Sequence, residues 1–182
     1  MNKKETNNWF HQEWVIGGVG AYPRVPRGNP PEGQKEELLM KQDAQTLAHA
    51  VKEHLVEADR KLMALLGMVV KEVTPGQAVC SMVVREDMVN SHLYCQGGLV
   101  FTLADQAFAY ACMSGNRAGV TLSAQVIFSN PAKLGDTLTA RAQVVTEGGR
   151  TASCDVEVTN QDQKVIARYQ GVNYRIKKPV IE

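Results

Sequence analysis

The chain has 182 residues, of which 44% are hydrophobic and 21% are charged, and its formal net charge is +1. These values are typical of one globular domain with its own core. A net charge near zero attracts neither nucleic acid nor an anionic membrane surface, and no apolar run reaches the roughly 18 residues that a membrane-spanning helix needs. The N-terminal lysines are not followed by an apolar segment, so we expect no signal peptide and a cytoplasmic protein.

The cysteines and histidines show no metal-binding or redox pattern. The four cysteines are widely spaced without a CxxC pair, and the four histidines form no HExxH or HxH cluster. Zinc sites and redox-active thiol pairs usually need closely spaced residues of these types. We therefore expect reduced structural thiols, no metal and no cofactor. The residues concerned are Cys80, Cys95, Cys112, Cys154, His11, His49, His54 and His92.

Residues 1–40 differ from the rest of the chain. The first 34 contain two tryptophans, a glycine run at 16–20 and four prolines, and they show neither a helical nor a strand period. We interpret residues 1–40 as a poorly ordered extension or arm, and residues 41–182 as a single domain.

The first periodic segment is helical and runs from about residue 43 to residue 66. Its apolar residues recur at steps of three and four, Asp43 can cap its start, and Gly67 can end it. Such an amphipathic helix is expected to cover an apolar surface of the domain. The expected apolar stripe consists of Ala44, Leu47, Ala48, Val51, Leu55, Ala58, Leu62 and Leu65.

The remaining segments predict strands around one buried helix. Residues 97–113, GGLVFTLADQAFAYACM, are apolar nearly all round, which is typical of a buried helix. Residues 85–96 are expected to form a loop, and the short connections between strands favour antiparallel neighbours. The order predicts an α+β fold in which a curved antiparallel sheet wraps around the helix. The expected strands are Met68–Val73, Gln77–Val84, Val120–Phe128, Thr137–Val145, Thr151–Val158 and Lys164–Ile176.

Asp105 is the single charged residue of the buried helix. None of its neighbours three or four positions away along the helix is basic. An aspartate is costly to bury without a partner, so its position indicates a catalytic carboxylate. The alternative is a structural, long-range ion pair, for example with Arg141 or Arg168.

Two glycines, Gly97 and Gly98, open the same helix. Glycine lets the backbone approach a ligand closely, and the first amides of a helix lack internal partners and lie at its positive end. An N–H of this turn can stabilise the oxyanion that forms when a carbonyl is attacked, although an ordinary loop-to-helix turn would look the same. Asn90, His92 and Gln96, in the preceding loop, are further candidates for hydrogen bonds to that group.

The segment MVNSHLYCQGGLVFTLADQAFAYAC, residues 88–112, resembles the core motif of the PaaI-type hot-dog thioesterases, the phenylacetyl-CoA thioesterase-like family. The family form reads approximately NGHxxCHGGxxFxLADxAFA. The likeness continues through FSNPAKLGDTLTARA and DVEVTNQDQKVIA and covers about residues 45–178, whereas residues 1–40 have no counterpart in it.

The resemblance implies a hot-dog fold that hydrolyses acyl-CoA thioesters, typically aromatic or medium-chain ones, without a cofactor. It also implies a homodimer, commonly paired into a tetramer, whose sites are shared between subunits. Gly97 takes the place of the amide that polarises the thioester carbonyl, Asp105 that of the carboxylate that activates water or attacks, and Asn90 that of the asparagine that positions the water. Gln96 stands where the family has histidine; it can donate a hydrogen bond but cannot take up a proton.

Several other residues are candidates for binding the substrate. They are Gly98, His92, Ser123, Lys133 and Arg150; Lys133 and Arg150, together with Arg117, lie in turns where cations can meet the CoA phosphates.

Two alternatives to a thioesterase stay open. One is a non-catalytic protein of the same fold that binds or senses acyl-CoA. The other is a hot-dog dehydratase, which would need a histidine paired with the acid, although no histidine follows His92 in the chain.

Overall fold

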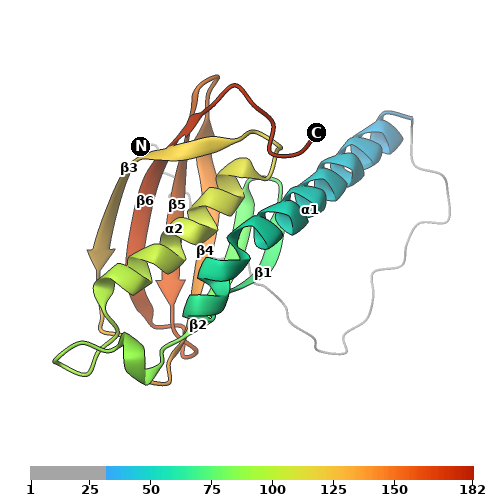
Figure 1. The fold of residues 1–182 in the computed structure, drawn as a ribbon. Coiled ribbons are helices and arrows are strands. Elements are labelled where there is room, and N and C mark those ends of the chain that lie inside the picture. The colour runs from blue at the N-terminus through green and yellow to red at the C-terminus, as the bar shows by residue number, and fades with distance from the viewer. Residues whose placement is uncertain (1–31) are drawn as a thin grey trace, which may run out of the picture.

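The computed structural model describes residues 32–182, and Figure 1 shows how its helices lie beside the sheet. Helix α1 comprises Glu32–Leu66, helix α2 comprises Gly97–Met113, and one 3₁₀ turn, η1, comprises Glu86–Met88. The predicted buried helix is confirmed at both ends, and each predicted strand is present within two residues of its expected bounds. The strands are β1 Val69–Thr74, β2 Gln77–Val83, β3 Gly119–Phe128, β4 Thr137–Glu147, β5 Thr151–Thr159 and β6 Val165–Arg175.

The six strands form one antiparallel sheet in the order β1-β2-β4-β5-β6-β3. After β2 the chain leaves the sheet, forms α2 across one of its faces, and returns at the far edge as β3 (Figure 1). Strand β4 then pairs with β2, and β5 and β6 fill the space between β4 and β3. This arrangement is the predicted hot-dog fold, with α2 as the enclosed helix.

The core lies between α2 and the inner face of the sheet. The strand positions that alternate with polar residues in β2, β4 and β5 are buried, as the period of two predicted. They are Ala78, Cys80, Met82, Leu138, Ala140, Ala142, Ala152, Cys154, Val156 and Val158. Most of α2 is buried against them, and the side that carries Asp105 is less covered.

The start of α1 differs from the prediction. The helix begins at Glu32, so Asp43 lies inside it and does not cap it, and the proposed boundary at residue 40 also falls within the helix. Residues 35–47 are exposed, so no apolar period marks this half of the helix in the sequence. Their high helix propensity and the ion pair between Glu37 and Lys41, at 2.7 Å, favour helix without burial. The part of the expected arm in residues 1–31 lies outside the described residues.

The apolar stripe of α1 is also displaced from the predicted one. Three of its predicted members, Ala48, Val51 and Leu55, are buried, and Met63 joins them. The other five are exposed: Ala44, Leu47, Ala58, Leu62 and Leu65. The expected end at Gly67 is confirmed, because Gly67 has a φ of 66° and Met68 N–H donates to the carbonyl of Met63 at 2.9 Å.

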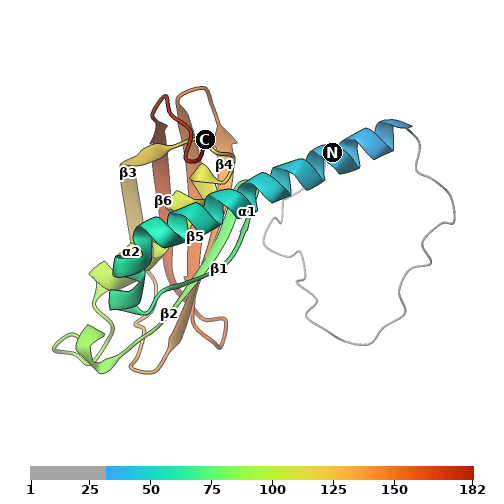
Figure 2. The ribbon, with the colours of Figure 1, turned by 45° about the vertical axis from the view of Figure 1, so that its right-hand side comes forward.

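The N-terminal half of α1 extends beyond the sheet (Figures 1 and 2). Residues 35–39 are exposed, so this part of α1 contributes little buried surface that a chain beginning at Met40 would lose. We expect such a chain to keep its activity and to lose less than about 1 kcal/mol of stability, a shift in Tm of roughly 2–4 °C. Calorimetry and the activity assay check this; a larger loss would show that residues 1–39 dock on the domain or on a second subunit.

Strand β3 is irregular in a way that the sequence did not indicate. The pairing with β6 shifts between Thr121 and Ser123, so Leu122 is an extra, bulged residue. Thr121 pairs with Asn173 and Ala124 with Gly171, both on the buried face of β6. The bulge therefore turns Thr121 toward α2, whereas strict alternation from Val120 to Phe128 would point it to the opposite face.

No helix in the described part of the chain is long and apolar enough to cross a membrane.

Candidate active site

Asp105 accepts hydrogen bonds from two hydroxyl groups on one carboxylate oxygen. The Tyr169 hydroxyl of β6 donates to Oδ1 at 2.6 Å, and the Thr121 hydroxyl of β3 donates to the same atom at 3.2 Å. Among the described residues, no hydrogen bond or ion pair reaches Oδ2. The side chain is half-buried, so one oxygen is held by the protein and the other is left to meet a ligand.

The alternative role of Asp105 in a long-range ion pair is not what the structure shows. Arg168 pairs with Glu157 at 2.6 Å, and the Arg141 guanidinium donates to the Thr159 hydroxyl at 3.3 Å. Arg168 lies next to Tyr169 in β6 and therefore on the opposite face of the sheet from α2. No cation of the described residues pairs with Asp105; its polar partners are the two hydroxyl groups.

A second set of contacts holds α2 from its other side. Asp59 of α1 accepts hydrogen bonds from Gln106 at 2.9 Å and from the Tyr110 hydroxyl at 3.2 Å. Gln106 is adjacent to Asp105, so polar contacts to α1 and to the sheet together set the rotation of α2 about its axis. This acidic residue on the buried side of α1 was not among the sequence candidates.

The N-terminus of α2 is built around Gly97. The side-chain oxygen of Gln96 accepts the Gly97 N–H at 3.1 Å, so Gln96 caps the helix. A Cβ on Gly97 would lie 3.1 Å from the Phe128 ring, whereas one on Gly98 would meet open space. Gly97 thus lets the end of β3 pack closely over the helix start.

The loop before α2 is ordered by Asn90. Its side-chain oxygen accepts the backbone N–H of His92 at 2.9 Å and that of Tyr94 at 3.3 Å. Asn90 and Gly97 line one open hollow of about 310 Å³ together with Tyr94, Cys95, Val100, Phe128, Ser129, Asn130, Pro131, Ala132 and Ile166. Burial raises the pKa of the Cys95 thiol in this hollow to about 11, so the thiol is protonated at neutral pH and is a poor nucleophile.

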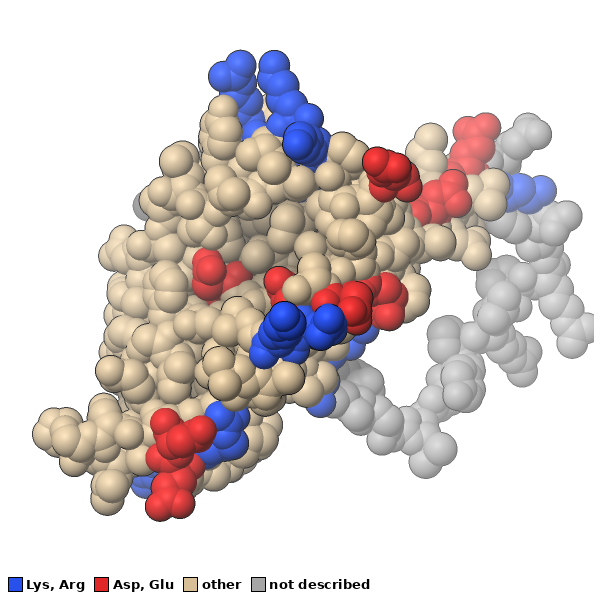
Figure 3. All heavy atoms as spheres, viewed as in Figure 1, with Lys and Arg blue, Asp and Glu red and all other residues tan. Residues whose placement is uncertain are grey.

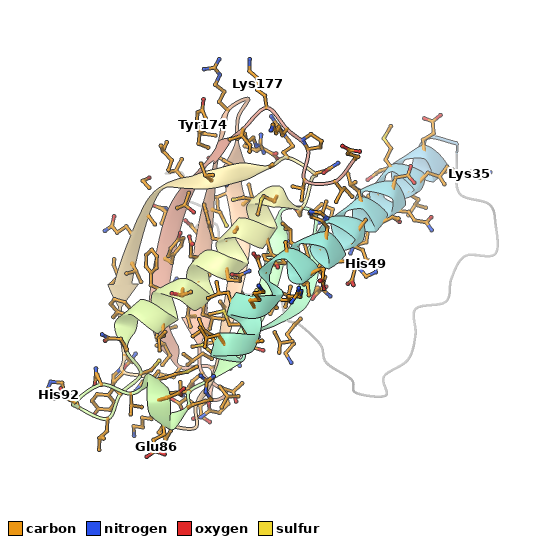
Figure 4. The ribbon with its side chains drawn as sticks, in the orientation of Figure 1. Lys35, His49, Glu86, His92, Tyr174 and Lys177 are labelled. Atoms are coloured by element: carbon orange, nitrogen blue, oxygen red, sulfur yellow. The ribbon has the colours of Figure 1, made fainter. Side chains whose placement is uncertain are left out.

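His92 does not join this hollow. It is exposed and lies at the tip of the loop, pointing away from the sheet (Figure 4). The structure therefore brings Asn90, Gln96 and Gly97 together and leaves His92 apart.

The predicted catalytic residues fall into two separate groups within one chain. Gly97 and Asp105 are eight residues apart in α2, which is about 12 Å along the axis of a helix. The helix-end group around Gly97 and the carboxylate group around Asp105 therefore lie apart in one chain.

The remaining substrate-binding candidates are widely spread. Lys133 forms a backbone bridge with Tyr94 and so lies beside the hollow, near the start of β4. Arg150 follows the other end of β4, where basic side chains gather at the end of the molecule that carries Lys177 (Figures 3 and 4). Arg117 also lies at that end, because its guanidinium donates to the carbonyl of Gly149 at 2.8 Å. Ser123 is exposed on β3, and no hydrogen bond joins its side chain to Asp105 in the described residues.

Comparison with known proteins identifies the family. A family model described as "Thioesterase superfamily" matches residues 94–167, which include Gly97, Asp105 and Thr121. Acyl-coenzyme A thioesterase PaaI of Escherichia coli K12 is 44% identical over 111 residues, which are 61% of this chain and 79% of that protein. This chain belongs to the thioesterase superfamily. The resemblance to PaaI-type thioesterases is confirmed, and with it the prediction of a thioester hydrolase.

Solved structures agree with this family. The E. coli PaaI protein matches with a TM-score of 0.73 and 38% identity over 75% of this chain and 98% of that one. A hypothetical thioesterase of Streptococcus pneumoniae solved with coenzyme A matches with a TM-score of 0.60 and 26% identity over 62% and 90% of the two chains. That protein was also solved with an aspartate and, separately, a threonine replaced by alanine, at positions sixteen residues apart.

Two residues of the carboxylate group were missed by the sequence analysis. Thr121 faces α2 only because of the bulge in β3, since strict alternation would point it outward, and Tyr169 lies in the strand with the least regular pattern. Tyr169 is 64 residues from Asp105 in the sequence, so no local spacing connects the two.

Proposed function

We propose that this protein hydrolyses acyl-CoA thioesters to a free acid and CoA. The observation that carries the proposal is a half-buried carboxylate, fixed at one oxygen, on a surface that is otherwise uncharged. Asp105 is the only charged residue in α2 and β3 together, and Figure 3 shows the surface over these elements as almost wholly uncharged with one isolated acidic group. Such a surface suits an apolar acyl group, and the isolated carboxylate suits attack on its thioester carbon.

A thioester carbonyl and the atom that attacks it are in contact, so we propose that the helix-end group and the carboxylate group of one chain are two half-sites that serve different substrate molecules. The chemistry follows from these half-sites. The Gly97 N–H at the positive end of α2 donates a hydrogen bond to the thioester oxygen and stabilises the oxyanion that develops there. Asp105 takes a proton from a water molecule, whose oxygen bonds to the carbonyl carbon, or it attacks that carbon itself; in the second case water hydrolyses the resulting mixed anhydride after CoA has left, which releases the acid and restores the carboxylate. The oxyanion then collapses, the C–S bond breaks, and CoA leaves as a thiolate, which needs little help from an acid because thiols ionise readily.

The two half-sites complete each other when two copies of the chain pair. Strand β3 is an edge strand of ten residues without any charge, and Leu122 and Ile127 on it are 63% and 59% exposed. Proteins protect such long, apolar edges from further pairing, and a second copy of β3 would cover this one. We propose a homodimer in which Gly97 of one subunit and Asp105 of the other meet at one substrate. Light scattering would test it; a monomer at assay concentration would contradict it.

The acyl group is proposed to be aromatic or of medium length. The less covered side of α2 near Asp105 includes Phe101, Ala109 and Met113, and Val126 of β3 lies close in the sheet, so the wall offered to the acyl group is apolar. The structural neighbour in E. coli comes from a phenylacetic acid degradation operon. A panel of phenylacetyl-, benzoyl-, hexanoyl- and acetyl-CoA, assayed for release of free thiol, tests both the reaction and the preference; acetyl-CoA is expected to be the poorest substrate.

The same panel separates this proposal from its rivals. A non-catalytic acyl-CoA binding protein would bind the panel members and release no thiol. A dehydratase needs a histidine beside the acid, and His49, His54 and His92, the histidines of the described part of the chain, are exposed and make no hydrogen bond to Asp105. The family and Asp105 therefore favour thioester hydrolysis.

For the CoA phosphates we propose Lys133 and Arg150 as contacts. These two residues lie beyond opposite ends of β4, which fits a site to which two subunits contribute.

Gln96 provides a test of the helix-end half-site. The side-chain oxygen of Gln96 accepts the Gly97 N–H, so the Gln96 side chain has to rotate away when a substrate carbonyl takes its place. After that rotation the NH₂ group of Gln96 can donate a hydrogen bond to the same carbonyl oxygen. We expect Gln96→Ala to lower kcat/KM roughly tenfold, the value of one hydrogen bond, and Gln96→His to keep most activity because imidazole also donates. Steady-state kinetics of the two variants check this; an alanine variant as fast as the wild type would show that Gln96 only caps the helix.

A further inference from the structure

We infer that Tyr169 is the positioning residue of the active carboxylate: it holds Asp105 Oδ1 so that Oδ2 alone faces the substrate. This inference rests on the proposed function, because it assigns Asp105 the reacting oxygen.

The contact geometry separates the two carboxylate oxygens. Tyr169 and Thr121 both donate to Oδ1, at 2.6 and 3.2 Å, and a carboxylate oxygen with two donors has little remaining capacity for a third. Short O–H···O⁻ bonds are the stronger kind of hydrogen bond, so Tyr169 supplies more of the restraint than Thr121. Because two hydroxyls on separate strands fix one oxygen, the carboxylate cannot exchange its oxygens freely, and Oδ2 is the atom left for water or thioester.

The tyrosine itself cannot move easily. Its side chain is 2% exposed, and its ring packs against Phe101 at 5.3 Å and Phe108 at 5.5 Å between ring centroids. Gly171, two residues on, makes this packing possible, because a Cβ there would lie 2.7 Å from the Phe108 ring and 2.8 Å from the Tyr169 ring. The aromatic rings thus hold the Tyr169 hydroxyl in place to donate to Asp105. Packing of this kind around a supporting residue fixes the orientation of a catalytic group.

Tyr169 is also a donor at every working pH. Burial, followed by the hydrogen bond to Asp105 and the negative charge of that carboxylate, raises the pKa of Tyr169 well above its usual value. The phenol therefore stays protonated and donates whenever Asp105 is ionised. A donor of this kind stabilises the ionised form of the carboxylate that it binds.

Few other groups around α2 change charge in the acidic range. The sheet presents Cys80 from β2 and Cys154 from β5, and burial raises the pKa of Cys80 to about 12. A hydrogen bond that the Cys154 thiol donates to Cys112, together with burial, raises the pKa of Cys154. Arg175 of β6 pairs with Glu147, and α1 contributes Lys52 and Asp59, of which Asp59 binds Gln106 and Tyr110. An acid limb that responds to Tyr169 therefore reports on Asp105.

The test compares Tyr169→Phe with Tyr174→Phe. The first removes only the hydroxyl and keeps the ring in its cluster; the second changes a more exposed tyrosine of the same strand that points away from α2 (Figure 4). We expect Tyr169→Phe to move the acid limb of the kcat/KM profile to higher pH by about one unit, the equivalent of one hydrogen bond to a charged group, while KM stays within about threefold. Tyr174→Phe should keep the wild-type profile. Thr121→Val should move the limb in the same direction by less.

A second readout does not depend on activity. The carboxyl resonance of Asp105 is followed by ¹³C NMR during a pH titration of the wild-type and Tyr169→Phe proteins, and its midpoint is expected to move upward in the variant. An unchanged midpoint in a folded Tyr169→Phe protein would overturn the inference, whether or not the protein hydrolyses acyl-CoA. Failure of the wild type to release thiol from any acyl-CoA would instead count against the proposed function.

Discussion

Replacing Asp105 with asparagine is expected to lower kcat for acyl-CoA hydrolysis by at least about 100-fold, because the enzyme loses its base or nucleophile. The amide is nearly the same size, and its oxygen can still accept the hydroxyls of Tyr169 and Thr121. Folding and acyl-CoA affinity should therefore change little. Steady-state kinetics, calorimetry and the binding of a non-hydrolysable acyl-CoA thioether measure the three properties separately.

A matched control is Asp155→Asn. Asp155 lies on β5 and accepts a hydrogen bond from Gln170 at 2.9 Å, so it is also a sheet-associated carboxylate with an uncharged partner. Because it lies on the face of the sheet away from α2, its replacement should leave kcat unchanged. If Asp105→Asn retained near-normal turnover, or if both variants lost activity equally, Asp105 would have no part in the reaction.

The second large effect is expected from Gly97→Pro, which deletes the N–H that the mechanism assigns to the oxyanion. Gly97 is the first residue of α2, a position where proline is well tolerated, and Gln96 before it has φ −58° and ψ 128°, which a following proline also allows. Loss of one oxyanion donor typically costs 100-fold or more in kcat. Gly97→Ala, which keeps the N–H and adds a Cβ against the movable Phe128 ring, is the control and should retain far more activity.

Mixing the two inactive variants tests whether the site is shared. In a mixed dimer, the Gly97→Pro chain still supplies Asp105 and the Asp105→Asn chain still supplies Gly97, so one of the two sites is intact. Random exchange between equal amounts of the two chains makes half of the dimers mixed, and activity should return to about one quarter of the wild-type value. No recovery, with subunit exchange demonstrated by mass spectrometry of tagged chains, would place each site within a single subunit.

The elements that local pattern predicted well are those whose burial is nearly complete. Helix α2 is apolar on all sides and lies between an irregular loop and a polar turn, so its bounds were read correctly from Gly97 to Met113. Strands β2, β4 and β5 alternate regularly because one face meets α2 and the other does not. In these cases a single physical cause, burial on one or on all sides, produces the period that the sequence displays.

The sequence predictions failed where the burial of a segment does not follow the spacing of its apolar residues. The N-terminal half of α1 is helical without being buried, so its start could not be found from apolar spacing. In the second half, Asp59 takes a core-facing position because two side chains of α2 bind it. In β3, one bulged residue reverses the direction of every side chain on one side of it, and nothing in the local sequence marks Leu122 as the extra residue.

The sequence by itself determined the family, the order of the elements and the residues at the centre of the proposed chemistry, because the motif around Gly97 and Asp105 is continuous in the chain. Tertiary structure decided the rest. It selected Tyr169 and Thr121 as the donors to Asp105, and it placed Asn90 with Gly97 while leaving His92 outside. These outcomes depend on strand register, on one bulge and on contacts between residues far apart in the chain, and short-range spacing carries no information about any of them.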